Sequence, residues 1–119
     1  MDLIKGSKFI PGFSQMYKVT EQGDVISVPR ISVHGKRIPL RILRKQVDKK
    51  GYYYVNLFYE NRDYTRRIHI LVGTLFIPNP DGHTIVGFKD GNKLNLRSDN
   101  LEWVSHKRYM VLRGRGYVI

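Results

Sequence analysis

The clearest periodic pattern of apolar residues lies in the middle of the chain. Five apolar side chains recur there at intervals of three and four residues: Ile68, Leu71, Val72, Leu75 and Phe76. This spacing places them along one side of an α-helix. Prolines at positions 78 and 80 stop the pattern, because a residue that precedes proline avoids helical geometry. The sequence therefore predicts a helix that begins near residue 67 and ends before residue 78.

A strand hairpin is predicted immediately before this helix. Residues 52–59 read YYYVNLFY, a run of aromatic and β-branched side chains that is typical of a β-strand. A polar turn at residues 60–63 follows, and residues 64–68 are expected to return as the partner strand.

The first half of the chain predicts shorter strands. Extended segments are expected at residues 16–20, 25–28, 30–33 and 37–43, and Gly23 supplies a positive φ in the turn between the first two. In the last two segments basic residues alternate with apolar ones. A period of two residues predicts one apolar face and one cationic face.

A strand, a loop and a helix are expected after the central helix. Residues 84–88 form a short strand, residues 89–97 a polar loop, and residues 101–104 a returning strand. Ser105 is a suitable N-cap for a final helix of about two turns, which Gly114 and Gly116 end.

Charge adds the first indication of a partner. The 119 residues contain 21 Lys and Arg against 10 Asp and Glu, a net charge of +11. Residues 1–50 hold eleven of the basic residues and four of the acidic ones. A polyanion relieves such self-repulsion, so nucleic acid is the first partner to consider and an anionic membrane surface the second.

Several classes of protein are excluded. Without cysteine, the chain forms neither disulfides nor thiolate zinc sites. The apolar runs are too short for a membrane span, and the first residues lack the apolar stretch of a signal peptide. We expect a cytoplasmic protein with no membrane partner.

Motifs in the second half resemble the HNH endonucleases of phage and intron type, a class of homing endonucleases. The matching segments are residues 67–80 (RIHILVGTLFIPNP), 89–95 (KDGNKLN) and 99–105 (DNLEWVS). Upstream, residues 10–13 (IPGF), 17–20 (YKVT) and 23–27 (GDVIS) resemble the nuclease-associated modular domain that often precedes the nuclease.

The resemblance implies an α+β fold in two parts. Residues 1–50 would form a small, basic, antiparallel β module that binds DNA, and residues 51–119 an HNH-like ββα-metal domain. It also implies double-stranded DNA as the partner, no small-molecule substrate, and a phage protein working in the cytoplasm of an infected bacterium.

The catalytic positions of the family are largely lost. By position in the resemblance, the metal ligand and the general base fall on Gly87 and Phe88, and the ligand on the last helix falls on Tyr109. Glycine offers no ligand atom, phenylalanine accepts no proton, and tyrosine is a poor ligand for a hard divalent cation at neutral pH. Asn100 retains the family's structural asparagine. We therefore expect a degenerate site without a bound metal or other cofactor.

Basic residues in two regions are the candidates for contacts with DNA phosphates. Such contacts release counterions and position a protein without reading sequence. The candidates are Arg30, Lys36, Arg37, Arg41, Arg44, Lys45, Lys49, Lys50, Lys93 and Arg97. The alternative interpretation is a solvated face in the first region and a loop-structuring role for Lys93 and Arg97.

Two other functions stay open. His83 and His106, with Asp90, could rebuild a site for a divalent metal such as magnesium, which would make the protein an active DNA endonuclease or nickase. His69 matches a family position at which packing and helix capping are expected. Alternatively, the scaffold could serve a phage regulator that binds a host protein.

Overall fold

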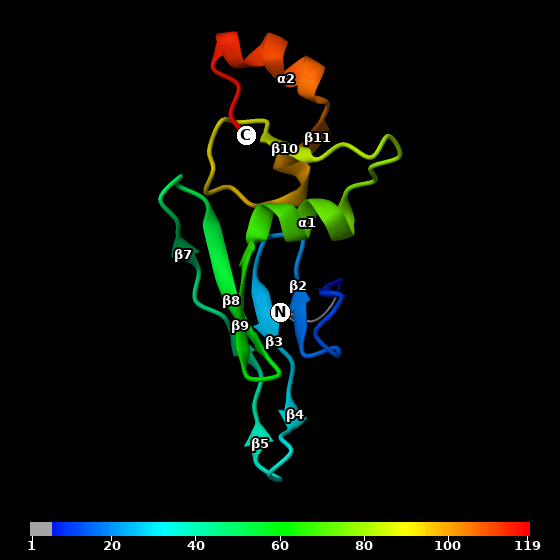
Figure 1. Cartoon of the computed structure of the whole chain (residues 1–119), viewed down its shortest axis with the longest axis vertical. Coiled ribbons are helices and arrows are strands. Elements are labelled where there is room, and N and C mark those ends of the chain that lie inside the picture. Colours follow the sequence, from blue (N-terminus) through cyan, green and yellow to red (C-terminus); the bar gives the residue numbers. More distant parts are fainter. Residues whose placement is uncertain (1–5) are drawn as a thin grey trace.

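The computed structural model describes residues 6–119, which form an elongated molecule of 54 × 28 × 26 Å (Figure 1). The N-terminal strands make an antiparallel sheet in the order β1-β2-β3-β6. Its members are β1 (Lys8–Phe9), β2 (Tyr17–Val19), β3 (Val25–Ser27) and β6 (Arg41–Ile42). The predicted hairpin of residues 16–28 is confirmed, and Gly23 has a φ of +91° in its turn.

A two-stranded ribbon, β4 (Arg30–Ile31) with β5 (Arg37–Ile38), projects from this sheet. Its register pairs Arg30 with Ile38 and Ile31 with Arg37. The prediction of one apolar and one cationic face is therefore wrong for the ribbon. Apolar residues stand at odd positions before the turn and at even positions after it, but the register pairs odd positions with odd ones and even with even. Ile31 is therefore opposite Arg37, and Ile38 is opposite Arg30. Each face of the ribbon carries both kinds of side chain.

A second sheet joins β7 (Gln46–Val47), β8 (Tyr53–Tyr59) and β9 (Arg62–Arg67). The turn between β8 and β9 is tighter than predicted. Glu60 and Asn61 alone connect the strands, with φ values of +50° and +61°. Two successive left-handed residues match the right-handed twist of a hairpin.

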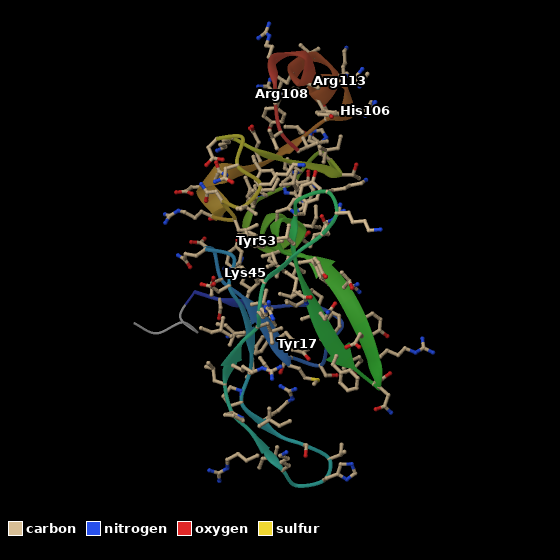
Figure 2. All side chains as sticks on the ribbon, turned by 90° about the vertical axis from the view of Figure 1, so that its left-hand side faces the viewer. Tyr17, Lys45, Tyr53, His106, Arg108 and Arg113 are labelled. Atoms are coloured by element: carbon tan, nitrogen blue, oxygen red, sulfur yellow. The ribbon has the colours of Figure 1, made fainter. Side chains whose placement is uncertain are left out.

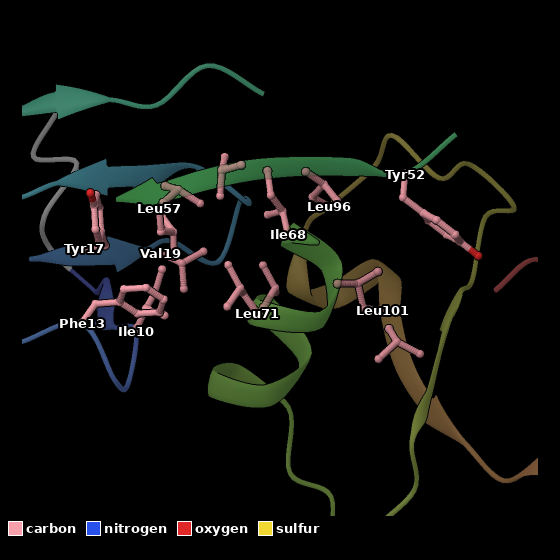
Figure 3. Packing of buried hydrophobic residues seen from close by; sticks show 14 of the residues in the cluster. Ile10, Phe13, Tyr17, Val19, Tyr52, Leu57, Ile68, Leu71, Leu96 and Leu101 are labelled. Atoms are coloured by element: carbon pink, nitrogen blue, oxygen red, sulfur yellow. The ribbon is translucent and has the colours of Figure 1, made fainter. Parts of the chain in front are cut away.

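Helix α1 (Ile68–Phe76) follows β9 directly and lies across the ends of both sheets (Figure 1). Its predicted apolar stripe faces inward: Ile68, Leu71 and Val72 are buried. Figure 3 shows Ile68 and Leu71 between β8 and the N-terminal strands, close to Val19 and Leu57. The helix therefore closes the core on which the rest of the chain is built.

The predicted ββα unit forms the end of the molecule opposite the β4–β5 ribbon (Figure 1). It consists of β10 (Ile85–Phe88), the 3₁₀ turn η1 (Ser98–Asn100), β11 (Leu101–Val104), α2 (His106–Leu112) and the 3₁₀ turn η2 (Arg113–Arg115). Ser105 caps α2 as predicted, since its hydroxyl accepts a hydrogen bond of 3.0 Å from the Arg108 N–H. Within the described chain, neither helix has the length and apolarity needed to cross a bilayer.

The N-terminal strands and the ββα unit share one core. Val19 and Val25 belong to the same buried cluster as Phe88 and Leu101. A side chain at Gly23 would overlap Leu96, so the β2–β3 turn packs directly on the loop after β10. The boundary between two domains at residue 50 stays a prediction from the sequence.

Trp103 connects the ββα unit to α1 through hydrogen bonds. Its indole N–H donates to the carbonyls of Gly73 and Ile77, at 3.2 and 3.1 Å. The Gly73 carbonyl also accepts from the Ile77 N–H at 3.2 Å, and Ile77 is the residue that caps the end of α1. The orientation of β11 relative to α1 is thereby fixed.

Candidate functional site

Gly87, to which the resemblance assigns a metal-ligand position, lies in β10 of the ββα hairpin. Gly87 is buried and pairs with Glu102 across the hairpin. Directly paired residues project to the same face of a sheet, so the side chain of Glu102 lies on the face that a ligand at position 87 would use. That face is already filled, because a Cβ atom at Gly87 would overlap the hydroxyl group of Tyr117.

Two hydrogen bonds hold Tyr117 over Gly87, one made by its hydroxyl group and one by the backbone of the next residue. Its hydroxyl donates a 2.7 Å hydrogen bond to the Glu102 carboxylate, and burial together with this bond raises the pKa of Tyr117. The Phe88 N–H donates to the Val118 carbonyl at 2.9 Å, which makes the 117–118 segment a short partner of β10. The residues present do not fit the divalent metal that the family resemblance implies.

Phe88, at the position of the general base, is buried in an aromatic group. Its ring centre lies 5.1 Å from that of His69 and 6.2 Å from that of Tyr52. His69 and Tyr52 themselves stack at 4.7 Å. The ring of Phe88 therefore packs in the hydrophobic core, at the position to which the resemblance assigns the general base.

His69 packs as expected but takes no part in capping. It is buried, and its Nδ1 atom finds no hydrogen-bond partner among residues 6–119. Burial, with a smaller contribution from Arg67, lowers the pKa of His69 to about 4. The imidazole is therefore neutral at physiological pH and stacks like an aromatic side chain.

Asn100 organises the loop between β10 and β11. Its amide donates to the Asn95 carbonyl at 3.0 Å, and its side-chain oxygen accepts from the Asp90 N–H at 3.0 Å. The carboxylate of Asp90 accepts from the Asn95 amide at 2.8 Å, which, with further bonds in the loop, lowers the pKa of Asp90. Asn100 thus ties the two ends of this loop together, and the family role that the resemblance assigns to it stays a prediction.

The side chains proposed for a rebuilt metal site do not form one. His106 is exposed on α2, whereas the backbone of His83 is tied into a turn by Asn79, and its ring lies 3.8 Å from Asp81. Tyr109 is half-buried on α2. Within residues 6–119 no group of three or more His, Asp or Glu side chains is placed to hold a metal ion.

The predicted DNA-contacting residues fall into two groups. Six have exposed or partly exposed side chains on or near the ribbon: Arg30, Lys36, Arg37, Arg41, Arg44 and Lys45. Two of these are tethered to the body of the molecule, Lys45 to Asp24 at 2.9 Å and Arg30 to Ser27 at 2.9 Å. Figure 2 shows Lys45 near the middle of the molecule, away from Arg108 and Arg113 on its C-terminal helical segments.

The second group surrounds the loop after β10. Lys49, Lys50 and Arg97 are exposed and Lys93 is half-buried. Lys93 donates to the Lys50 carbonyl at 2.8 Å, so the structure joins residues that are 43 positions apart in sequence. Arg97 lies beside Asp99, at 3.3 Å.

The roles of Tyr117, Glu102 and Arg67 were not evident in the sequence. Each depends on a contact across the fold: Tyr117 with Glu102, and Arg67 with Asp48 at 2.9 Å. Strand register creates both contacts, and no local motif signals them.

Comparison with known proteins agrees with this geometry. The NUMOD4 motif model matches residues 8–58, and an HNH endonuclease model matches residues 66–111. The structure is similar to that solved in a study of DNA binding and cleavage by the HNH homing endonuclease I-HmuI. The TM-score is 0.72 at 34% identity, over 92% of this chain and 59% of that one. Together these matches support the HNH homing endonuclease family as the one that this chain resembles along most of its length.

Two curated relatives show the same relationship. The DNA endonuclease I-HmuI of Bacillus phage SP01 is 35% identical over 84% of this chain, and the match covers 52% of that protein. An uncharacterized HNH endonuclease of Acanthamoeba polyphaga mimivirus is 48% identical over 50% of this chain, covering 18% of its own length. The chain thus spans about half, or less, of the curated relatives it matches.

Proposed function

We propose that this protein is a catalytically degenerate HNH endonuclease homologue that binds duplex DNA through its basic N-terminal strands. The observation that supports the loss of catalysis is that Gly87 carries no side chain and that the Tyr117 hydroxyl fills the space that a Cβ atom there would need. Burial of Phe88 supports the proposal at the position of the base.

Binding of DNA is supported by the charge on the ribbon and beside it. Lys36, Arg37, Arg41 and Arg44 are exposed, and within residues 6–119 their side chains make no hydrogen bond or ion pair. A two-stranded ribbon is narrow enough to enter the major groove of B-DNA. Cations that are free of protein partners are available to neutralise phosphates.

A supercoiled-plasmid gel tests both halves of the proposal. Purified protein is incubated with the plasmid in magnesium, manganese or EDTA, across a series of salt concentrations. We expect retardation that weakens steeply with salt and no nicking in any metal. Nicking that requires a metal would establish the enzyme alternative, and the His83→Ala and His106→Ala variants would then show whether those residues hold it.

The site of DNA contact is tested by charge reversal. Arg41→Glu with Arg44→Glu should abolish retardation, because two contacts are replaced by repulsion. The matched control is Lys107→Glu with Arg108→Glu on α2, at the far end of the long axis (Figure 1). Equal losses in both double variants would mean that affinity follows net charge alone and that the N-terminal strands have no particular role.

A host-protein partner is the second candidate, favoured by the apolar side chains on the ribbon. Ile31 is 72% exposed and Val33 96% exposed. Exposed β-branched pairs of this kind occur at protein interfaces as well as against thymine methyl groups. A protein role predicts that Arg41→Glu with Arg44→Glu spares partner capture, whereas Ile31→Ser with Val33→Ser abolishes it.

A further inference from the structure

A separate cationic cluster converges on the ring of Tyr52, which precedes β8. The guanidinium carbon of Arg67 lies 4.5 Å from the ring centre, and the ammonium nitrogen of Lys93 lies 4.7 Å from it. Arg67 is the last residue of β9, and Lys93 belongs to the loop after β10. Three separate segments thus place two positive charges against one aromatic ring.

Both cations are held by hydrogen bonds to the turn before β8. The Arg67 Nε–H donates to the Asp48 carboxylate at 2.9 Å, and the Lys93 ammonium donates to the Lys50 carbonyl at 2.8 Å. The other oxygen of Asp48 accepts from the N–H groups of Lys50 and Tyr52, which lowers the pKa of Asp48. The arrangement is organised before any ligand arrives.

The positive charge at this place exceeds the negative charge. Arg67 pairs with the carboxylate of Asp48, whereas Lys93 makes no ion pair within residues 6–119, and the exposed Lys49 and Lys50 add two further cations. The ring of Tyr52 attracts cations through its quadrupole but does not neutralise them. Within residues 6–119, the terminal nitrogens of Arg67 have no hydrogen-bond partner, and Lys93 uses one of its three donors.

We propose that Arg67 and Lys93 form a clamp for a backbone phosphate of duplex DNA. This inference rests on the DNA binding proposed above and adds a second contact, outside the ribbon. A planar guanidinium fork with an ammonium group beside it is a suitable donor set for phosphate oxygens.

The clamp lies next to the position at which the family performs its chemistry. Tyr52, under both cations, stacks on His69, and His69 contacts Phe88. A phosphate bound by Arg67 and Lys93 would therefore lie near Phe88 and Gly87, the positions to which the resemblance assigns the catalytic groups. In this interpretation the protein keeps a phosphate-positioning device of a nuclease-like fold while the groups that would cut are absent.

The test measures binding of a short random-sequence DNA duplex to Arg67→Gln and Lys93→Gln variants of the full chain across a salt series. Each variant should weaken binding roughly tenfold at ~0.1 M salt and reduce the slope of log Kd against log salt by about one. The matched control is Lys107→Gln, which removes an ammonium group from α2, away from the N-terminal strands and from Tyr52, and should leave the slope unchanged.

A further variant separates binding from a merely structural role. Asp48→Asn keeps an oxygen for the turn but removes the charge that opposes Arg67, so it should tighten DNA binding. Weaker binding by a folded Asp48→Asn protein would contradict the clamp.

Unchanged slopes in both Arg67→Gln and Lys93→Gln, with affinity still lost in the Arg41→Glu, Arg44→Glu variant, would overturn the clamp and leave the proposed function standing. Absence of DNA binding by the unmodified protein would overturn the proposed function and the clamp together.

Discussion

Gly87 and Tyr117 compete for one volume: the Tyr117 hydroxyl occupies the space into which any side chain at position 87 would extend. The hydroxyl is fixed there by Glu102, the residue paired with Gly87 across the hairpin. The glycine is therefore more than a missing ligand. It is the residue that lets the 117–118 segment lie against β10.

This relationship predicts a strong coupling between the two positions. Gly87→Ala should destabilise the protein by about 1–3 kcal/mol, the usual cost of overpacking. The same substitution in a Tyr117→Ala background should cost much less, because the obstructing ring is gone. Chemical denaturation of the two single variants and the double variant measures the coupling. Additive effects would mean that the two side-chain positions are independent.

The same contact predicts how catalytic chemistry would have to be restored. Gly87→Asp, Phe88→His and Tyr109→Asn return the side chains that the family resemblance implies. We expect this triple variant to stay inactive because Tyr117 still fills the site. Adding Tyr117→Ala should allow nicking of supercoiled plasmid in magnesium or manganese and not in EDTA.

Circular dichroism of both multiple variants provides the control for folding. Equal nicking by the triple and the quadruple variant would show that Tyr117 does not obstruct the site. Inactivity of a folded quadruple variant would show that the loop geometry differs as well.

His69 predicts a loss of stability in mild acid. Its pKa of about 4 in the folded protein is below the ordinary value of 6.5, so the unfolded chain binds the proton more tightly. The contribution of a neutral His69 is complete above about pH 6.5 and is lost as the pH falls toward 4, with a total of about 3 kcal/mol. The lowered pKa values of Asp48 and Asp90 act at lower pH, below their ordinary value of 3.8.

The His69→Phe variant isolates this effect. It keeps a ring between Tyr52 and Phe88 and removes the unpartnered Nδ1 atom. Unfolding free energies measured at intervals from pH 7 to pH 4 should fall less for this variant than for the unmodified protein. Parallel curves would assign the acid sensitivity to another group.

Tyr17 predicts a dependence of the second sheet on the first. Its hydroxyl donates to the Phe58 carbonyl at 2.9 Å and accepts from the Phe58 N–H at 3.1 Å. Tyr17→Phe leaves both groups of β8 unpaired and should cost about 1–3 kcal/mol in thermal or chemical unfolding. Tyr59→Phe is the control, since its hydroxyl bonds to the exposed Ser14, and it should change stability little. Equal effects would contradict a special role for Tyr17.

The sequence by itself determined the elements and the family. The apolar stripe of α1, the strand at residues 52–59 and the Ser105 cap depend on local spacing and side-chain type, which act over a few residues. The predicted loss of catalytic groups at Gly87 and Phe88 likewise rests on position, because the flanking motifs fix the alignment with the family.

Only the tertiary structure shows which side chain fills the space beside Gly87. The overlap of Tyr117 with Gly87 depends on a contact between residues thirty positions apart, and the cluster at Tyr52 on three segments brought together by two sheets. The ribbon shows the same limit: its alternating pattern predicted separate faces, but the turn fixed a register that mixes them. Periodicity within one strand specifies which side chains share a face of that strand, whereas register, set by turns and packing, specifies what they meet.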